Sequence, residues 1–232
     1  MNSDNQHFNT LVKNGNPVGE IIAVNQFLIQ IKGLQPCNIR ALVMFEDGSK
    51  GFVQQINSDH VVVLHLGQET LRTGTTAVIQ HQELVCKVGK DFIGRVVNVM
   101  GEPLDDKGPI AADAVWPVFN MAPPLYTRKL LDKQLESGII VIDSLFPLLR
   151  GQRMSLLGDG KSGKSTLVTQ LTINQKNTDQ VVVYVLIAKR RSDVDTLLAS
   201  LQSNGGLENA VVIISTMFES LIMSYLAPYV GV

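Results

Sequence analysis

Short β-branched runs separated by turn residues fill the first part of the chain. Between about residues 19 and 80 they read EIIAV, FLIQIKG, ALVMF, GFVQQI and HVVVLHL. Strands this short and this closely spaced predict a small antiparallel barrel or sandwich of five or six strands. Asp47-Gly48 lies between two runs and predicts a hairpin, because both residue types tolerate the backbone angles of a tight turn. We therefore expect a β-barrel domain over residues 17–80, preceded by a polar, mobile tail over residues 1–16.

The pattern changes after about residue 81. Residues 92–100 predict one more strand, and GEPLDDKGPI predicts a loop in which Asp105-Asp106 forms a solvated turn. Apolar strands then alternate with helical segments: RMSLLG, VVVYVLIA and AVVIIS as strands, KSTLVTQLTINQK and SDVDTLLASLQ as helices. Continuous apolar strands joined by helices indicate a parallel sheet. The predicted fold class is thus α/β plus β, with an α/β domain over residues 81–232.

The C-terminal stretch NAVVIISTMFESLIMSYLAPYVGV is the nearest approach to a membrane span. Glu219 lies in its middle, where a carboxylate would cost about 2.5–3.5 kcal/mol on insertion into a bilayer. We expect instead a buried strand over residues 211–215 followed by a buried helix. Hydrophobic residues make up 45% of the chain, charged residues 18%, and the formal net charge is −1. This composition is typical of a globular protein and gives no general attraction to nucleic acid, which we do not expect as a partner.

The candidate chemistry lies in GDGKSGKS, which fits G-x-x-x-x-G-K-[ST] between a predicted strand and a predicted helix. Its glycines let consecutive N–H groups turn toward an anion, and the following helix adds the partial positive charge of its N-terminus. We expect the lysine before the last serine to reach the β- and γ-phosphates of ATP or ADP, and Ser165 to ligate Mg²⁺. The predicted nucleotide-binding residues are Gly158, Asp159, Gly160, Lys161, Ser162, Gly163, Lys164 and Ser165.

A family resemblance adds to this interpretation. DKQLESGIIVIDSLFPLLRGQRMSLLGDGKSGKS resembles the stretch that leads into the phosphate loop of the α subunit of F-type ATP synthases. GRVVNVMGEPLDDKGPI, AKRRSDV and SYLAPY follow that family's order, and the similarity covers about residue 15 to the end. The resemblance implies an N-terminal β-barrel and a RecA-like P-loop nucleotide-binding domain. It also implies a ring shared with F1 β subunits around a central stalk, and a peripheral place on the cytoplasmic face of the cell inner membrane.

The resemblance implies a nucleotide-binding, non-catalytic role in ATP synthesis coupled to proton transport by a translocase complex. The catalytic subunit of the family carries a Glu after the strand that matches VVVYVLIA, whereas the α subunit usually carries Gln. Lys189 stands there in this chain, and a lysine cannot accept a proton from water at neutral pH. We therefore assign no catalytic residue, and we predict that the chain alone does not hydrolyse ATP.

The resemblance also implies segments that do not follow SYLAPY here: the strand with the Mg²⁺-organising Asp, and a helical C-terminal domain. The RecA-like domain is thus expected to be incomplete, with a gap in its sheet between the phosphate-loop strand and the strand matching VVVYVLIA. Two alternatives stay open. The chain could be a truncated α-like paralogue or remnant with no activity of its own, or a soluble P-loop ATPase of the secretion-ATPase or Rho type.

Overall fold

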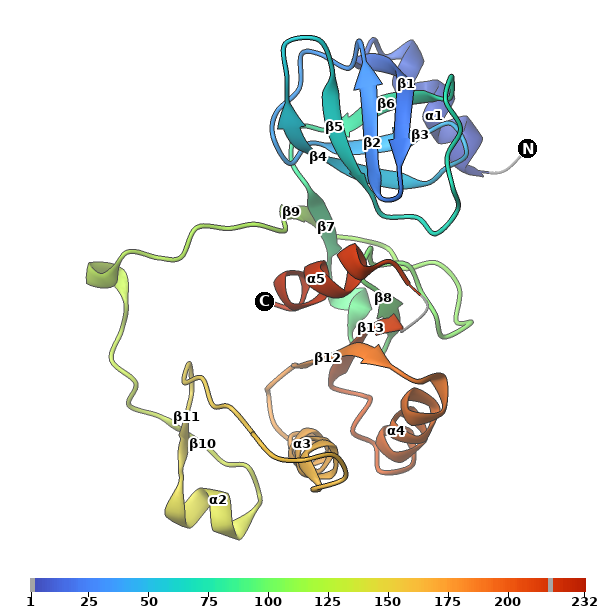
Figure 1. Ribbon diagram of the computed structural model, residues 1–232. Helices are drawn as coiled ribbons and strands as arrows, with labels where there is room; N and C mark the ends of the chain where they lie inside the picture. Colours follow the sequence, from blue (N-terminus) through green and yellow to red (C-terminus); the bar gives the residue numbers. More distant parts are fainter. Residues whose placement is uncertain (1–2, 217–218) are drawn as a thin grey trace.

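The computed structural model describes residues 3–216 and 219–232. Met1 and Asn2 of the expected tail, and Met217 and Phe218 of the apolar C-terminal stretch, lie outside the described residues. A β-barrel occupies one end of the molecule, and a parallel sheet with its helices lies at the other (Figure 1). The division into residues 1–16, 17–80 and 81–232 stays a prediction.

The N-terminal part is a closed barrel in which every neighbouring pair of strands is antiparallel, so the predicted barrel is confirmed. Alternate residues of its strands point inward and form a buried apolar core that includes Ile29, Phe45 and Val63. The Asp47-Gly48 hairpin forms between the third and fourth strands, and only Gly48 of the pair has a positive φ, 89°. The strands follow the order β1-β2-β5-β4-β3-β6, with β1 Val18–Asn25, β2 Leu28–Lys32, β3 Leu42–Phe45, β4 Lys50–Ile56, β5 Val61–His65 and β6 Thr76–His81.

The expectation of a mobile N-terminal tail is wrong. The α-helix α1 spans Ser3–Lys13, and its Phe8 and Leu11 are buried against Met44 and Val78 of the barrel. The two apolar residues are three apart, so they share one face of the helix. The segment is polar except for this small apolar face, which becomes buried when it packs against the outside of the barrel.

The second part contains a three-stranded sheet in which both strand pairs are parallel, as the apolar runs predicted. Its order is β12-β13-β8, with β12 Val182–Lys189, β13 Ala210–Thr216 and β8 Val96–Asn98. The strand expected over residues 92–100 is shorter, because η1 Lys90–Phe92 and a turn at residues 93–94 precede it and a second turn at residues 99–100 follows it. The predicted helices form as α3 Lys164–Asn174 and α4 Arg191–Ser203, and α5 Leu221–Val230 follows the last strand.

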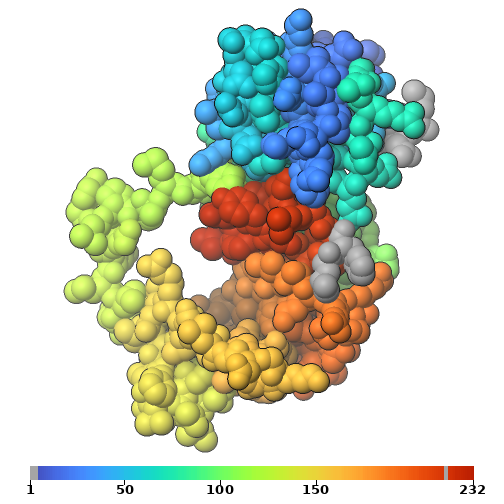
Figure 2. All heavy atoms as spheres, in the orientation of Figure 1, coloured from blue at the N-terminus to red at the C-terminus, as the bar shows by residue number. Residues whose placement is uncertain are grey.

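The two faces of this sheet are covered by different helices. Val212 and Ile214 point toward α3 and α4, whereas Val211 and Ile213 point toward α5. The helix α5 also packs against barrel residues such as Leu66 and therefore joins the two halves of the molecule, as Figure 2 shows. Among the described residues, no helix is both long and apolar enough to cross a membrane.

One predicted strand does not form. Residues 153–158, RMSLLG, have no strand hydrogen bonds, and Met154, Leu156 and Leu157 are exposed. A strand requires a neighbour for its N–H and C=O groups, and among the described residues β12 pairs with β13 alone. The apolar pattern alone was therefore not enough to predict a strand here. It shows that these residues favour burial, but not that a neighbouring strand is present to pair with them.

An extended arm of residues 119–157 precedes the phosphate loop and stands away from the body of the molecule (Figure 2). The middle of the arm contacts the body where Asn174 and Gln175, at the end of α3, donate hydrogen bonds to the carbonyl oxygens of Ser137 and Glu136, at 2.9 and 2.8 Å. The remaining short elements are β7 Val85–Val88, β9 Ala114–Pro117, η2 Leu125–Thr127, β10 Gln134–Leu135, α2 Ile140–Leu145 and β11 Leu148–Leu149.

Candidate nucleotide-binding site

The glycine-rich loop leads directly into α3. Gly163 precedes the helix with φ 86°, a left-handed conformation that favours glycine. At Gly158 a Cβ would lie 2.8 Å from the Ser162 hydroxyl oxygen, so a larger residue there would require the Ser162 side chain to move. Gly160 has open space around its Cα, and Lys161, with φ 63°, takes a left-handed conformation without being glycine. Of the three glycines of the loop, Gly163 alone uses the backbone freedom that the sequence predicted for all of them.

Lys164 holds the loop together. Its Nζ donates hydrogen bonds to the carbonyl oxygens of Gly158 and Asp159, at 2.7 and 2.6 Å, and to the Ser162 hydroxyl at 3.1 Å. All three acceptors lie in the loop itself, so the ammonium group occupies the mouth of the loop. A phosphate oxygen offers a stronger acceptor than these neutral groups, because it carries charge.

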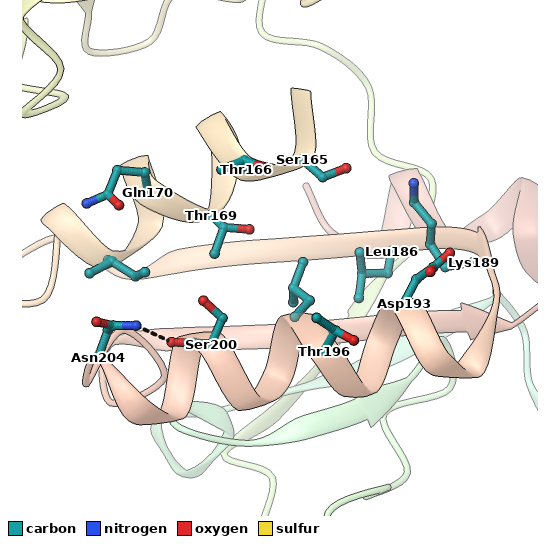
Figure 3. Close-up of a pocket in the computed structure, with 12 residues that line it drawn as sticks. Ser165, Thr166, Thr169, Gln170, Leu186, Lys189, Asp193, Thr196, Ser200 and Asn204 are labelled. Atoms are coloured by element: carbon teal, nitrogen blue, oxygen red, sulfur yellow. Dashed lines mark hydrogen bonds between the residues drawn. The ribbon is translucent and has the colours of Figure 1, made fainter. Parts of the chain in front are cut away.

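A groove of about 440 Å³ begins at the first turn of α3 and runs between α3, β12 and α4 (Figure 3). Polar side chains of α3 and α4 line it together with the apolar Ile173, Leu186 and Leu197. Tyr184 of the same strand is buried, and burial raises the pKa of its hydroxyl. The lining residues are Ser165, Thr166, Thr169, Gln170, Ile173, Leu186, Lys189, Asp193, Thr196, Leu197, Ser200 and Asn204.

An irregularity at the end of β12 determines where Lys189 lies. The pairing of β12 with β13 shifts register between Ile187 and Lys189, and the intervening Ala188 has φ 51°. This left-handed residue forms a bulge that turns the strand end. In Figure 3 the Lys189 side chain rises from the strand toward the first turn of α3, beside Asp193.

The structure brings together only part of the predicted site. Lys164 contacts Gly158, Asp159 and Ser162, and Ser165 lines the groove, whereas Gly160, Lys161 and Gly163 take part in neither; every residue of the predicted site except Lys164 is exposed. The polar residues of α3 and α4 in the groove were missed by sequence reasoning, because nothing in a sequence indicates that two helices face each other across a strand. Their only signal was the run of Ser, Thr and Asp within otherwise apolar helices; the missed polar residues are Thr166, Thr169, Gln170, Asp193, Thr196, Ser200 and Asn204.

Comparison with known proteins shows which family the chain resembles. Residues 138–232 match the model of the ATP synthase alpha/beta family, nucleotide-binding domain. A protein named ATP synthase subunit alpha from Caldanaerobacter subterraneus subsp. tengcongensis is 35% identical to this chain over 215 residues. A protein of the same name from Neisseria gonorrhoeae is 32% identical to it over 214 residues. Each alignment covers 92% of this chain. The chain is therefore similar to proteins of the ATP synthase alpha/beta family, and its residues 138–232 match that family's nucleotide-binding domain.

The relatives are longer than this chain, which spans 42% of the length of each of these two proteins. The match begins at Gly138, so the ATP synthase alpha/beta family model includes the last part of the arm with α2, the loop, the groove, and the helices α3, α4 and α5. Nucleotide binding is the property that this family description implies for residues 138–232.

The residues present fit a phosphate-bearing nucleotide. The first turn of α3 presents backbone N–H groups that no earlier helical carbonyl can satisfy, since the helix's first backbone bond runs from the Leu167 N–H to the Gly163 oxygen at 2.9 Å. Lys164 adds a positive charge at the same end of the helix. For Mg²⁺, the Ser165 and Thr166 hydroxyls and the Asp193 carboxylate all face the groove, and oxygen ligands of these kinds suit that ion. Bound Mg²⁺ would neutralise phosphate charge, and Ser165 would hold it there.

Proposed function

We propose that this chain is an alpha-type, nucleotide-binding and non-catalytic subunit of the F1 sector of an ATP synthase. The observation that carries the proposal is the Lys164-centred loop at the start of α3, within the segment that matches the family's nucleotide-binding domain. In this proposal residues 158–165 hold the phosphates of ATP or ADP, and Ser165 ligates Mg²⁺. The second part of the chain is then a partial RecA-like P-loop domain.

The proposed partners and location follow from the relatives. Proteins named ATP synthase subunit alpha are similar to this chain over 92% of its length. We propose that the chain joins F1 β subunits and the other synthase subunits in a ring, peripheral to the cytoplasmic face of the inner membrane, where proton movement is coupled to ATP synthesis.

The end of β12 supports a non-catalytic role. Lys189 faces the groove, and its ammonium group donates hydrogen bonds but cannot accept a proton from an attacking water. Hydrolysis would therefore require a base from elsewhere. We expect a neighbouring subunit to supply the catalytic site in the assembled complex.

Equilibrium binding of Mg-ATP to the 232-residue chain tests the proposal. We expect binding by the unaltered chain and loss of at least about tenfold in affinity for Lys164→Ala, because a charge-assisted contact is removed. Lys129→Ala removes the same charge from an exposed position of the arm and serves as the matched control. Equal affinity of all three proteins would contradict the proposal.

Hydrolysis assays separate the alternatives. We expect Mg-ATP hydrolysis only when a matching β subunit is present. Hydrolysis by the chain alone would indicate a soluble P-loop ATPase instead. A chain that neither binds nucleotide nor copurifies with a β subunit would indicate a paralogue without activity of its own.

A further inference from the structure

The groove beside the phosphate loop has a positively charged residue at the end of β12. Lys189 lines it together with Ser165 and Thr166, the second and third residues of α3. Its side chain projects toward that first turn in Figure 3. Of the three consecutive basic residues, Lys189 lines the groove, and the neighbouring Arg190 and Arg191 are not among its lining residues.

The charges that face this groove are few. Lys189 and Asp193 are its charged lining residues in the described part of the chain, and Lys164 holds the adjoining loop. A nucleotide whose phosphates extend past Ser165 would therefore meet a cation on each side, one from the loop and one from the strand. Polyphosphates bind most strongly where several positive charges converge, and a bound metal ion usually provides one of them.

We propose that Lys189 is a second phosphate-binding residue, and that its charge replaces part of the charge that Mg²⁺ would supply at this site. The ligand class is a nucleoside di- or triphosphate, whose outer phosphate group Lys189 binds. This inference rests on the proposed nucleotide site. Its consequence is a site whose affinity for polyphosphate depends less on Mg²⁺ than the same site with a neutral residue at this position.

The test measures the affinity of the 232-residue chain for ATP, and for inorganic tripolyphosphate as a probe without a base, by calorimetry in Mg²⁺ and in EDTA. Lys189→Gln keeps a polar side chain of moderate length and removes the charge. We expect it to weaken binding roughly 10-fold or more in EDTA, as for loss of a charge-assisted hydrogen bond, and by about threefold or less in Mg²⁺. Arg190→Gln removes an equal charge outside the groove and should leave both affinities unchanged.

Asp193→Asn provides an independent variant. Its carboxylate lines the same groove as Lys189 and repels phosphate, so its removal should tighten binding in EDTA. The proposal is overturned if Lys189→Gln binds as tightly as the unaltered chain in EDTA, or loses the same factor with and without Mg²⁺.

Lys164→Ala separates this inference from the proposed function. If Lys164→Ala loses binding while Lys189→Gln does not, the nucleotide site stands and the role of Lys189 is wrong. If Lys164→Ala binds tripolyphosphate as the unaltered chain does, or if the unaltered chain binds neither probe, both proposals are wrong.

Discussion

The Ser220 hydroxyl donates a hydrogen bond to the backbone carbonyl oxygen of Leu66 at 3.1 Å. Leu66 follows the last residue of β5 in the barrel, and Ser220 precedes α5, so this buried contact joins the two halves of the molecule. The same hydroxyl oxygen accepts a hydrogen bond from the Met223 N–H at 3.4 Å and caps the helix. One small side chain therefore fixes α5 both at its start and against the barrel.

We expect Ser220→Ala to lower the free energy of unfolding by about 1–3 kcal/mol, because it removes a helix cap and leaves the buried Leu66 carbonyl unpaired. Urea denaturation monitored by circular dichroism measures the change. Ser192→Ala, an exposed position within α4, should change the free energy of unfolding by less than about 0.5 kcal/mol. Similar changes for the two variants would show that the contact with Leu66 contributes nothing.

Ala188 is expected to be a site where glycine is better than alanine. Its φ of 51° is left-handed, which costs an L-residue roughly 1–2 kcal/mol, partly offset by the greater freedom of glycine in the unfolded chain. Ala188→Gly should therefore raise the free energy of unfolding by about 0.5–1 kcal/mol in a urea titration. The matched variant Ala210→Gly, at the buried start of β13, should lower it, and a loss at both positions would contradict the strain at Ala188.

Local patterns predicted most of the elements. The β-branched runs of the barrel and the Asp47-Gly48 turn carry their structure in short stretches, and so do the apolar runs of β12 and β13. The predictions that failed concern segments whose structure depends on residues far away in the sequence. Residues 153–158 have the composition of a strand and lack a neighbour, whereas α1 looks like a solvated segment until the barrel surface covers Phe8.

The site followed the same rule. The loop and Lys164 were predictable, because G-x-x-x-x-G-K-[ST] is read from consecutive residues. The groove was not predictable, since Ser165, Lys189 and Asp193 line it together only after α3 and α4 pack against β12.

Asp105 also depends on a residue that the local sequence does not indicate. A solvated turn was expected there, and for Asp105 this is wrong, because its side chain is only 8% exposed and forms an ion pair with Arg95.

The pair of Arg95 and Asp105 predicts a pH dependence of stability. The Asp105 carboxylate accepts hydrogen bonds from Arg95 Nε and Nη2, at 2.7 and 2.8 Å, and from the Val96 N–H at 3.2 Å. Chiefly the Arg95 hydrogen bond holds the pKa of Asp105 well below its usual range. A carboxyl whose pKa is depressed by folding stabilises the protein above its unfolded pKa of about 4, and this contribution is lost as the pH falls below that value.

We therefore expect Asp105→Asn to lower the free energy of unfolding at pH 7, and the difference from the unaltered chain to shrink steadily between about pH 5 and pH 2. Urea titrations at several pH values measure it. Asp106→Asn changes the exposed neighbour and should give a small difference that varies little with pH. A difference for Asp105→Asn that stays constant over this range would show that the ion pair does not set the pKa of Asp105.

The helix α1 is expected to be held to the barrel mainly by Phe8. This side chain is 6% exposed and packs with Leu11 against Met44 and Val78. Phe8→Ala removes the largest apolar contact, and core replacements of this kind cost about 3 kcal/mol or more. Because the few other α1 contacts cannot replace that amount, we expect the helix to detach while the closed barrel stays folded.

Hydrogen exchange reports this directly. In the unaltered chain, amides of residues 7–13 should exchange slowly; in Phe8→Ala they should exchange at rates near those of an unstructured peptide, whereas the amides of β3 and β6 keep their protection. Val12→Ala changes an apolar residue of the same helix that is 37% exposed, and it should leave the protection of α1 in place. Rapid exchange over residues 7–13 in the unaltered chain would restore the interpretation of this segment as a mobile tail.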